Sequence, residues 1–114
     1  MATGAALAFK LRREPRVAVC FMGDGAANEG AFHEGVNMGA IWELPVVYVI
    51  ENNLYGASTP TRMVFRTKTI SERAAGYGIK GMRIKAVDPE YVSATVDEIA
   101  EEIRRTSTPF LLQT

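Results

Sequence analysis

The sequence predicts an α/β fold in which helices flank a mostly parallel sheet, and two observations carry this prediction. First, the apolar runs at residues 16–22 and 46–50 lack polar alternation, which is typical of strands buried on both faces. Second, segments with helical composition or spacing separate the strand-like runs along the whole chain. This alternation indicates a parallel sheet joined by right-handed crossovers, and 114 residues suit one domain with a real core.

The first half of the chain contains two predicted helices and two predicted strands. We expect helices over residues 2–12 and 28–43, and strands over residues 16–22 and 46–50. The first helical segment is rich in Ala and Leu, which favour helices. Pro15 and Pro45 end the two helices, because proline lacks the N–H that a helix interior needs.

The second half begins with a polar segment and then returns to the same alternation. We expect an irregular loop over residues 51–69, helices over 70–77 and from Asp88 onward, and strands over 82–87 and 109–113. Asp88 is a good N-cap and Pro89 suits the first helical position. Apolar residues then recur at helical spacing, at Val92, Val96, Ile99 and Ile103.

Composition excludes several classes of protein. The chain has 13 basic and 13 acidic residues, so it lacks the basic excess of most nucleic-acid binders. No apolar run approaches the roughly 18 residues of a membrane span. One cysteine allows no internal disulfide, and one cysteine with one histidine cannot by themselves form a zinc site. We therefore expect a cytoplasmic protein that binds neither nucleic acid nor membrane.

A glycine-rich turn follows the first predicted strand and is the first candidate site. Its residues are Gly23-Asp24-Gly25, and glycines let a backbone turn tightly and approach a ligand closely. The following helix would offer free N–H groups to a phosphate. Asp24 would repel that phosphate unless a cation lay between them, and Mg²⁺ is the usual cation. A plain strand-to-helix turn is the alternative.

A second polar turn, Asn52-Asn53, follows the next predicted strand. Asn53 lies 29 residues after Asp24, which is about one βαβ unit. Neighbouring parallel strands would place the two turns side by side, where an amide oxygen and a carboxylate can share one hard cation. Asn-Asn is also ordinary turn chemistry, but the two turns at this spacing favour a site.

The segment over residues 23–56 resembles the thiamine-diphosphate motif, in which GDG is followed by NN one βαβ unit later. The sequence of this segment is similar to that of the alpha subunit of the decarboxylating component of 2-oxo acid dehydrogenase complexes. Pyruvate, branched-chain and acetoin dehydrogenases belong to that family. All of residues 1–114 resemble the middle of that longer subunit. The resemblance implies a partial thiamine-diphosphate-binding fold and one domain that binds the cofactor and magnesium.

The resemblance also implies roles for five residues. The side chains of Asp24 and Asn53 would coordinate Mg²⁺, with the backbone carbonyl of Tyr55 as a third protein ligand. Gly25 and Ala26 would meet the diphosphate through their backbone N–H groups. No catalytic residue is assigned, because in this family the glutamate that activates the cofactor comes from the beta subunit.

The activity implied by resemblance is oxidative decarboxylation of a pyruvate-like 2-oxo acid, with acyl transfer to lipoamide. Thiamine diphosphate supplies the carbanion chemistry. The implied partners are a beta subunit and a second alpha subunit in a heterotetramer, and a lipoyl acyltransferase core. We expect the 114-residue chain alone to be inactive. The alternatives are an acetoin-cleaving dehydrogenase subunit and a non-catalytic phosphate-binding or scaffold domain.

Two features of the second predicted helix have no assigned function. Gly35 and Gly39 share one face, so another segment must approach that face closely. Helix-on-sheet packing would explain this, but Glu34 followed by Gly39 resembles an interface pattern of the family, which favours a subunit interface. His33 is interpreted as the partner of Glu29, four residues earlier, on the helix surface.

Overall fold

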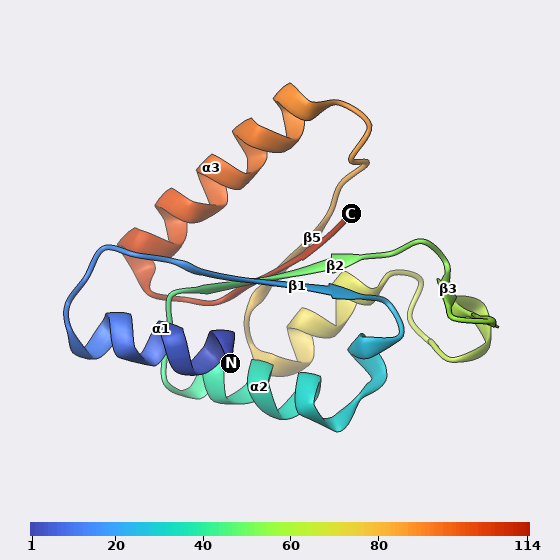
Figure 1. Cartoon of the computed structure of the whole chain (residues 1–114), viewed down its shortest axis with the longest axis horizontal. Helices are drawn as coiled ribbons and strands as arrows, with labels where there is room; N and C mark the ends of the chain where they lie inside the picture. The colour runs from blue at the N-terminus through green and yellow to red at the C-terminus, as the bar shows by residue number, and fades with distance from the viewer.

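The computed structural model describes residues 1–114 and contains one four-stranded sheet with helices on both faces (Figure 1). The α-helices are α1 (Ala2–Leu11), α2 (Gly30–Ile41) and α3 (Pro89–Thr106). The sheet contains β1 (Ala18–Gly23), β2 (Val46–Glu51), β6 (Phe110–Gln113) and β5 (Lys80–Arg83), in that spatial order. The remaining elements are 3₁₀ segments η1 (Ala26–Asn28), η2 (Thr61–Met63) and η3 (Ile70–Tyr77), and a small hairpin of β3 (Tyr55–Gly56) and β4 (Thr59–Pro60).

All neighbouring strands of the sheet run parallel, which confirms the predicted fold class. β1 pairs with β2 from Ala18 opposite Val46 to Gly23 opposite Glu51. The two polar turns therefore leave the sheet at the same edge, as the spacing predicted. Ligands of open α/β sheets bind outside this edge, where the strands end.

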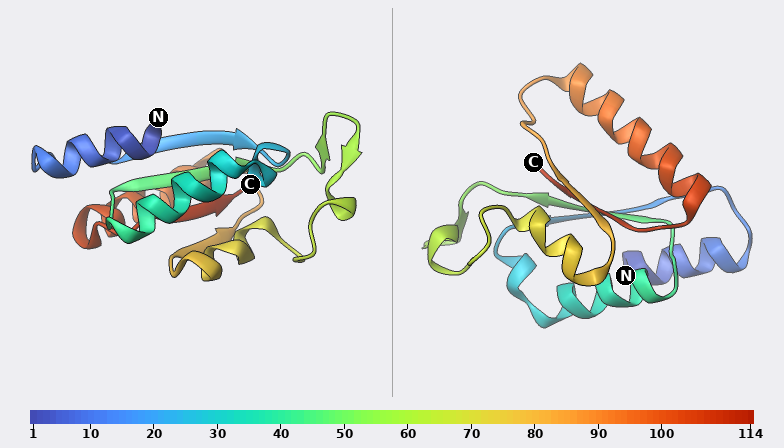
Figure 2. Two further views of the ribbon diagram at one scale, coloured as in Figure 1. Left: turned by 90° about the horizontal axis from the view of Figure 1, so that it is seen from below. Right: turned by 180° about the vertical axis from the view of Figure 1, so that it is seen from behind.

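The two faces of the sheet are covered differently. Helices α1 and α2 and the segment η3 cover one face, whereas α3 alone covers the other (Figures 1 and 2). β2 supplies both layers, because its side chains alternate between the faces. Tyr48 and Ile50 pack on the side of α2, and Val47 and Val49 pack on the side of α3.

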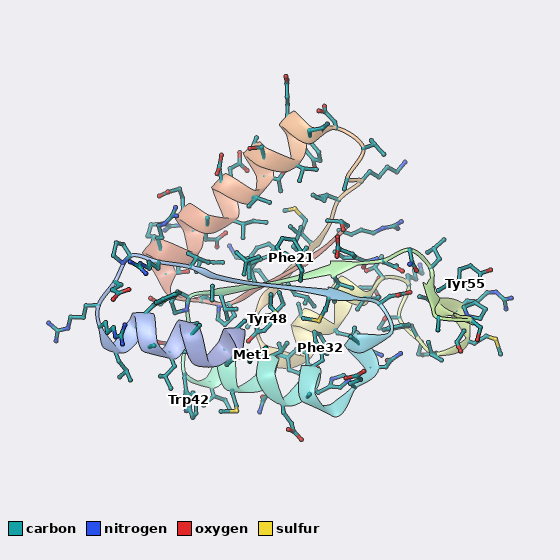
Figure 3. The ribbon with its side chains drawn as sticks, viewed as in Figure 1. Met1, Phe21, Phe32, Trp42, Tyr48 and Tyr55 are labelled. Carbon is teal, nitrogen blue, oxygen red and sulfur yellow. The ribbon has the colours of Figure 1, made fainter.

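The edge strand β1 is covered on only one face. Val19 is 48% exposed and Phe21 is 67% exposed, because α3 packs over β2 and β6 and leaves β1 open. Figure 3 shows Phe21 on the side of the sheet that faces α3, opposite to Phe32 and Tyr48. Val19 and Phe21 line an apolar groove of about 260 Å³ that α3 borders with Val92, Val96 and Ile99.

The third predicted strand begins two residues earlier and ends four residues earlier than expected, at Lys80–Arg83 instead of residues 82–87. Its partner β6 ends at Gln113, so the pairing with β5 ends opposite this residue, at Arg83. A Cβ at Gly81 would collide with the carbonyl of Ser71 and lie 2.6 Å from the Cβ of Ala74. The strand therefore includes a glycine that lets η3 approach, which the apolar pattern of residues 82–87 did not reveal.

The second predicted helix also differs from expectation. Helix α2 begins at Gly30, and a single 3₁₀ turn with an extended Glu29 separates it from Gly25. The glycine face of α2 packs inside the chain, because a Cβ on Gly39 would lie 2.7 Å from the hydroxyl of Tyr48. That hydroxyl also donates to the carbonyl of Gly35 at 2.9 Å. The close approach that the glycine pair requires is therefore met within the chain, by Tyr48 of β2, as the helix-on-sheet alternative expected.

None of the helices combines the length and the apolar character that crossing a membrane requires.

Candidate functional site

Asp24 occupies the turn directly after β1, and its carboxylate is only partly satisfied. The residue is 2% exposed. Its Oδ1 accepts a hydrogen bond from the N–H of Gly25 at 3.0 Å, but its buried Oδ2 has no hydrogen-bond partner. An unpartnered buried carboxylate oxygen is costly, so it indicates a place for a cation or a donor.

A cavity of about 220 Å³ lies against this turn. Asp24, Gly25 and Asn28 line one side, and the other side comes from the segment that follows β2. The residues on that second side are Gly56, Thr59, Thr61, Val64 and Phe65. The cavity therefore joins two segments that are far apart in sequence, and Asp24, whose buried Oδ2 lacks a partner, is one of the residues that line it.

The glycine turn and the hairpin touch through their backbones. A Cβ on Gly25 would lie 3.2 Å from the Cα of Gly56, and a Cβ on Gly56 would lie 3.1 Å from the Cα of Gly25. Neither residue has a positive φ, so close approach rather than backbone conformation requires glycine here. The two glycines hold the hairpin against the turn of Asp24.

In the asparagine turn after β2, both side-chain oxygens accept hydrogen bonds from backbone N–H groups of the same turn. Oδ1 of Asn52 accepts from the N–H of Leu54, and Oδ1 of Asn53 accepts from the N–H of Tyr55, both at 2.9 Å. Asn53 is exposed and does not line the cavity of Asp24. The Asn53 oxygen keeps a second lone pair for another partner.

Tyr55 lies in the hairpin at one end of the molecule (Figure 3). It stands opposite Pro60 in the two-stranded pairing. The N–H of Thr61 donates to the carbonyl of Leu54, so Tyr55 and Pro60 form a non-hydrogen-bonded pair and the Tyr55 carbonyl points away from β4. A carbonyl without a cross-strand donor is available to a cation.

The structure brings the predicted residues together in part. Asp24 and Gly25 share one cavity, whereas Asn53 and Tyr55 lie on the adjoining turn and hairpin. Ala26 begins η1, so one 3₁₀ turn and an extended Glu29 lie between Gly25 and the start of α2. The N–H of Gly25 is held by Asp24.

The sequence did not single out Gly56, Phe65 or Asn28, although all three line the cavity. Gly56 directly follows a residue that the motif had marked, which was the available signal. Phe65 and Asn28 carry no signal, because only the folding of the loop against the glycine turn brings them together.

His33 contacts Tyr77 instead of the predicted Glu29. Its Nδ1 and the hydroxyl of Tyr77 form a hydrogen bond, and Phe32 packs edge-on against both rings. Burial raises the pKa of Tyr77. This cluster lies between α2 and η3 and lines none of the cavity of Asp24.

No three His, Cys, Asp or Glu side chains come together as a metal site. A cation beside Asp24 would therefore depend on one carboxylate together with amide and carbonyl oxygens. Oxygen ligands of this kind suit a hard ion that also keeps water or phosphate oxygens, such as Mg²⁺.

Comparison with known proteins identifies the family. Residues 1–114 match the family model described as the dehydrogenase E1 component. The chain belongs to the dehydrogenase E1 component family. One relative of this E1 chain is the alpha subunit of acetoin:2,6-dichlorophenolindophenol oxidoreductase from Bacillus subtilis, which is 42% identical over 99% of the chain and 34% of the relative.

Two other E1 relatives are named for 2-oxo acids. The alpha subunit of the Rhizobium meliloti pyruvate dehydrogenase E1 component is 37% identical over 99% of the chain and 32% of the relative. The alpha subunit of 2-oxoisovalerate dehydrogenase from Bacillus subtilis is 39% identical over 99% of the chain and 34% of the relative. The chain thus spans about a third of the length of these relatives.

Solved structures agree on the fold of this E1 chain. A thiamine diphosphate-dependent 4-hydroxybenzoylformate decarboxylase from Rhodococcus jostii matches with a TM-score of 0.70 and 24% identity, over 99% of this chain and 21% of that chain. Transketolase from Leishmania mexicana matches with a TM-score of 0.74 and 17% identity, over 99% of this chain and 18% of that chain. At these identities the likeness concerns the fold alone.

Proposed function

We propose that this E1 chain binds thiamine diphosphate together with Mg²⁺ at the turn of Asp24. One observation carries the proposal: Oδ2 of Asp24 is buried beside a cavity at the carboxyl edge of the sheet and lacks a partner. A divalent cation would satisfy this oxygen. The same cation would remove the repulsion between Asp24 and a diphosphate.

The residues present fit such a group. Asp24 would supply the charged ligand, and the side-chain oxygen of Asn53 and the backbone carbonyl of Tyr55 would complete the protein's share. The backbone N–H groups of Gly25 and Ala26 would face the diphosphate, with that of Gly25 exchanging its bond to Asp24. The contact between Gly25 and Gly56 supports this arrangement, because it holds both turns together.

We propose further that the chain is the cofactor-binding part of a longer alpha subunit. Thiamine diphosphate, when bound, supplies the carbanion chemistry of 2-oxo acid decarboxylation. The chain's own residues would bind and orient the diphosphate end. In this proposal a beta subunit, a second alpha subunit and a lipoyl acyltransferase core supply the rest, and lipoamide accepts the acyl group. The 114-residue chain alone would be inactive.

A second candidate is an acetoin-cleaving dehydrogenase subunit. The relative from Bacillus subtilis that is named for acetoin shares 42% identity, compared with 37% and 39% for the pyruvate and 2-oxoisovalerate relatives described above. Both candidates require the same cofactor site and differ only in the substrate.

Calorimetry on the complete subunit, assembled with its beta subunit, tests the proposal. We expect thiamine diphosphate to bind only when Mg²⁺ is present, and Asp24→Ala to abolish that binding. Asp97→Ala, an exposed position on α3, is the matched control and should bind as the wild type does. Unchanged affinity in Asp24→Ala contradicts the proposal. Turnover of pyruvate, branched-chain 2-oxo acids and acetoin then distinguishes the candidates.

A further inference from the structure

Arg73, in the middle of η3, connects the two sides of the cavity beside Asp24. Its guanidinium donates two hydrogen bonds to the turn that follows Gly25. Nη1 donates to the carbonyl of Ala27 at 2.7 Å, and Nη2 donates to Oδ1 of Asn28 at 2.8 Å. Two hydrogen bonds from the Arg73 side chain therefore hold η1, the 3₁₀ turn that follows Gly25.

The same guanidinium stacks on the opposite wall. Its Cζ lies 4.3 Å from the centre of the Phe65 ring, which is a close cation–π contact. Phe65 and Asn28 both line the cavity of Asp24, so Arg73 touches one residue on each side of it. No carboxylate pairs with Arg73 within salt-bridge distance.

The segment that carries Arg73 is anchored to the sheet by hydrogen bonds. η3 is tied to the last strand through Gln113, whose buried Oε1 accepts from the N–H groups of Ile70 and Ser71 at 2.8 and 3.1 Å. Burial lowers the pKa of Arg73, although a guanidinium remains charged at neutral pH. A planar group with a fixed fork can bond one element and stack on another at once, which a lysine cannot do.

From this juxtaposition we infer that Arg73 is a positioning residue for the metal–diphosphate site, where it couples the turn of Asp24 to the loop over residues 61–69. The inference rests on the proposed function. Arg73 acts through Ala27, Asn28 and Phe65, so its role is to fix the shape of the cavity before the ligand arrives. The loop over residues 61–69 then forms a wall of the site.

Arg73→Lys and Phe65→Leu test the inference in the complete subunit assembled with its beta subunit. Arg73→Lys keeps the charge but loses the fork and the stack, and Phe65→Leu loses only the stack. We expect each to weaken Mg²⁺-dependent binding of thiamine diphosphate by about tenfold to a hundredfold, the range seen when supporting groups around a metal are lost. Turnover at saturating cofactor should stay within about threefold of the wild type. Arg83→Lys, on an exposed position of β5, is the control.

Hydrogen exchange adds a measurement that a merely structural residue would not change. In the wild type, the cofactor should slow exchange both in residues 24–28 and in residues 61–69. In Arg73→Lys, protection of the first segment should remain and that of the second should be lost, with the ligand-free melting temperature within about 4 °C of the wild type.

The outcomes separate the two proposals. If the wild type binds thiamine diphosphate and both variants bind within twofold of it, the inference about Arg73 fails and the proposed function stands. If affinity and ligand-free melting temperature fall together in both variants, Arg73 is only structural and the inference fails. If the wild type shows no Mg²⁺-dependent binding, the proposed function fails and the inference fails with it.

Discussion

The two strand ends that form the candidate site are built in opposite ways. At the end of β1, Asp24 is buried and one of its oxygens has no partner. At the end of β2, Asn53 is exposed and its oxygen is bonded to the N–H of Tyr55, two residues away. The carboxylate of the first turn still lacks a partner for Oδ2, whereas the amide oxygen of the second turn is already bonded within the turn. The unmet requirement for a cation or a donor therefore lies at Asp24.

The largest expected effect on cofactor affinity comes from removing the negative charge of Asp24. Asp24→Asn keeps the size of the side chain and an oxygen for the N–H of Gly25. We expect Mg²⁺-dependent affinity for thiamine diphosphate to fall by about a hundredfold or more, beyond the usual effect of a supporting residue. Without ligand, the free energy of unfolding should change little, because the gain from removing a buried unpaired charge is opposed by the cost of a buried amide NH2 that also lacks a partner. Denaturant unfolding and calorimetry of the complete subunit give both quantities.

The contact between the two turns should come second. Gly25→Ala and Gly56→Ala each add a Cβ about 3 Å from the opposite backbone, so the turns must separate. We expect each change to cost about 1–3 kcal/mol of unfolding free energy and to weaken cofactor binding. The double variant should cost less than the sum, because both changes strain one contact. Gly30→Ala is the control, because nothing lies within 4 Å of an added Cβ there. Additive costs would show that the two turns do not depend on each other.

The smallest expected effect distinguishes Asn53, a proposed metal ligand, from Asn52, which has only a role in the turn. Asn52→Ala and Asn53→Ala each remove one equivalent hydrogen bond to the backbone, and each should cost about 0.5–1.5 kcal/mol. Only Asn53→Ala should also weaken Mg²⁺-dependent binding, by about tenfold. Equal affinities in the two variants would remove Asn53 from the proposed ligand set.

The features that the sequence could predict are those encoded by local pattern. The buried runs of β1 and β2 and the capping residues of α3 were recognisable, and Asp88 does accept from the N–H of Glu90 at 3.0 Å. The spacing of Asp24 and Asn53 correctly placed both turns at one edge of the sheet. These elements are determined by residues close together in the chain.

The features that the sequence could not predict depend on distant contacts. The hairpin of β3 and β4 has two residues in each strand, too few for any periodicity, and the hairpin packs against Gly25. Gly39 faces Tyr48 of β2, so the glycine pair of α2 had an internal explanation. The place of β6 between β2 and β5 likewise follows from packing rather than from chain order.

The position of β1 has a consequence for how the site communicates with the rest of the molecule. The strand that carries Asp24 has a hydrogen-bonded neighbour on one side only, and one of its faces is open at Val19 and Phe21. Its local opening should therefore require less free energy than that of β2, which is paired on both sides. Occupation of the Asp24 turn would lower the free energy of the closed strand. Local opening of β1 should therefore become rarer when the site is occupied, and the open face at Val19 and Phe21 should become more rigid with it.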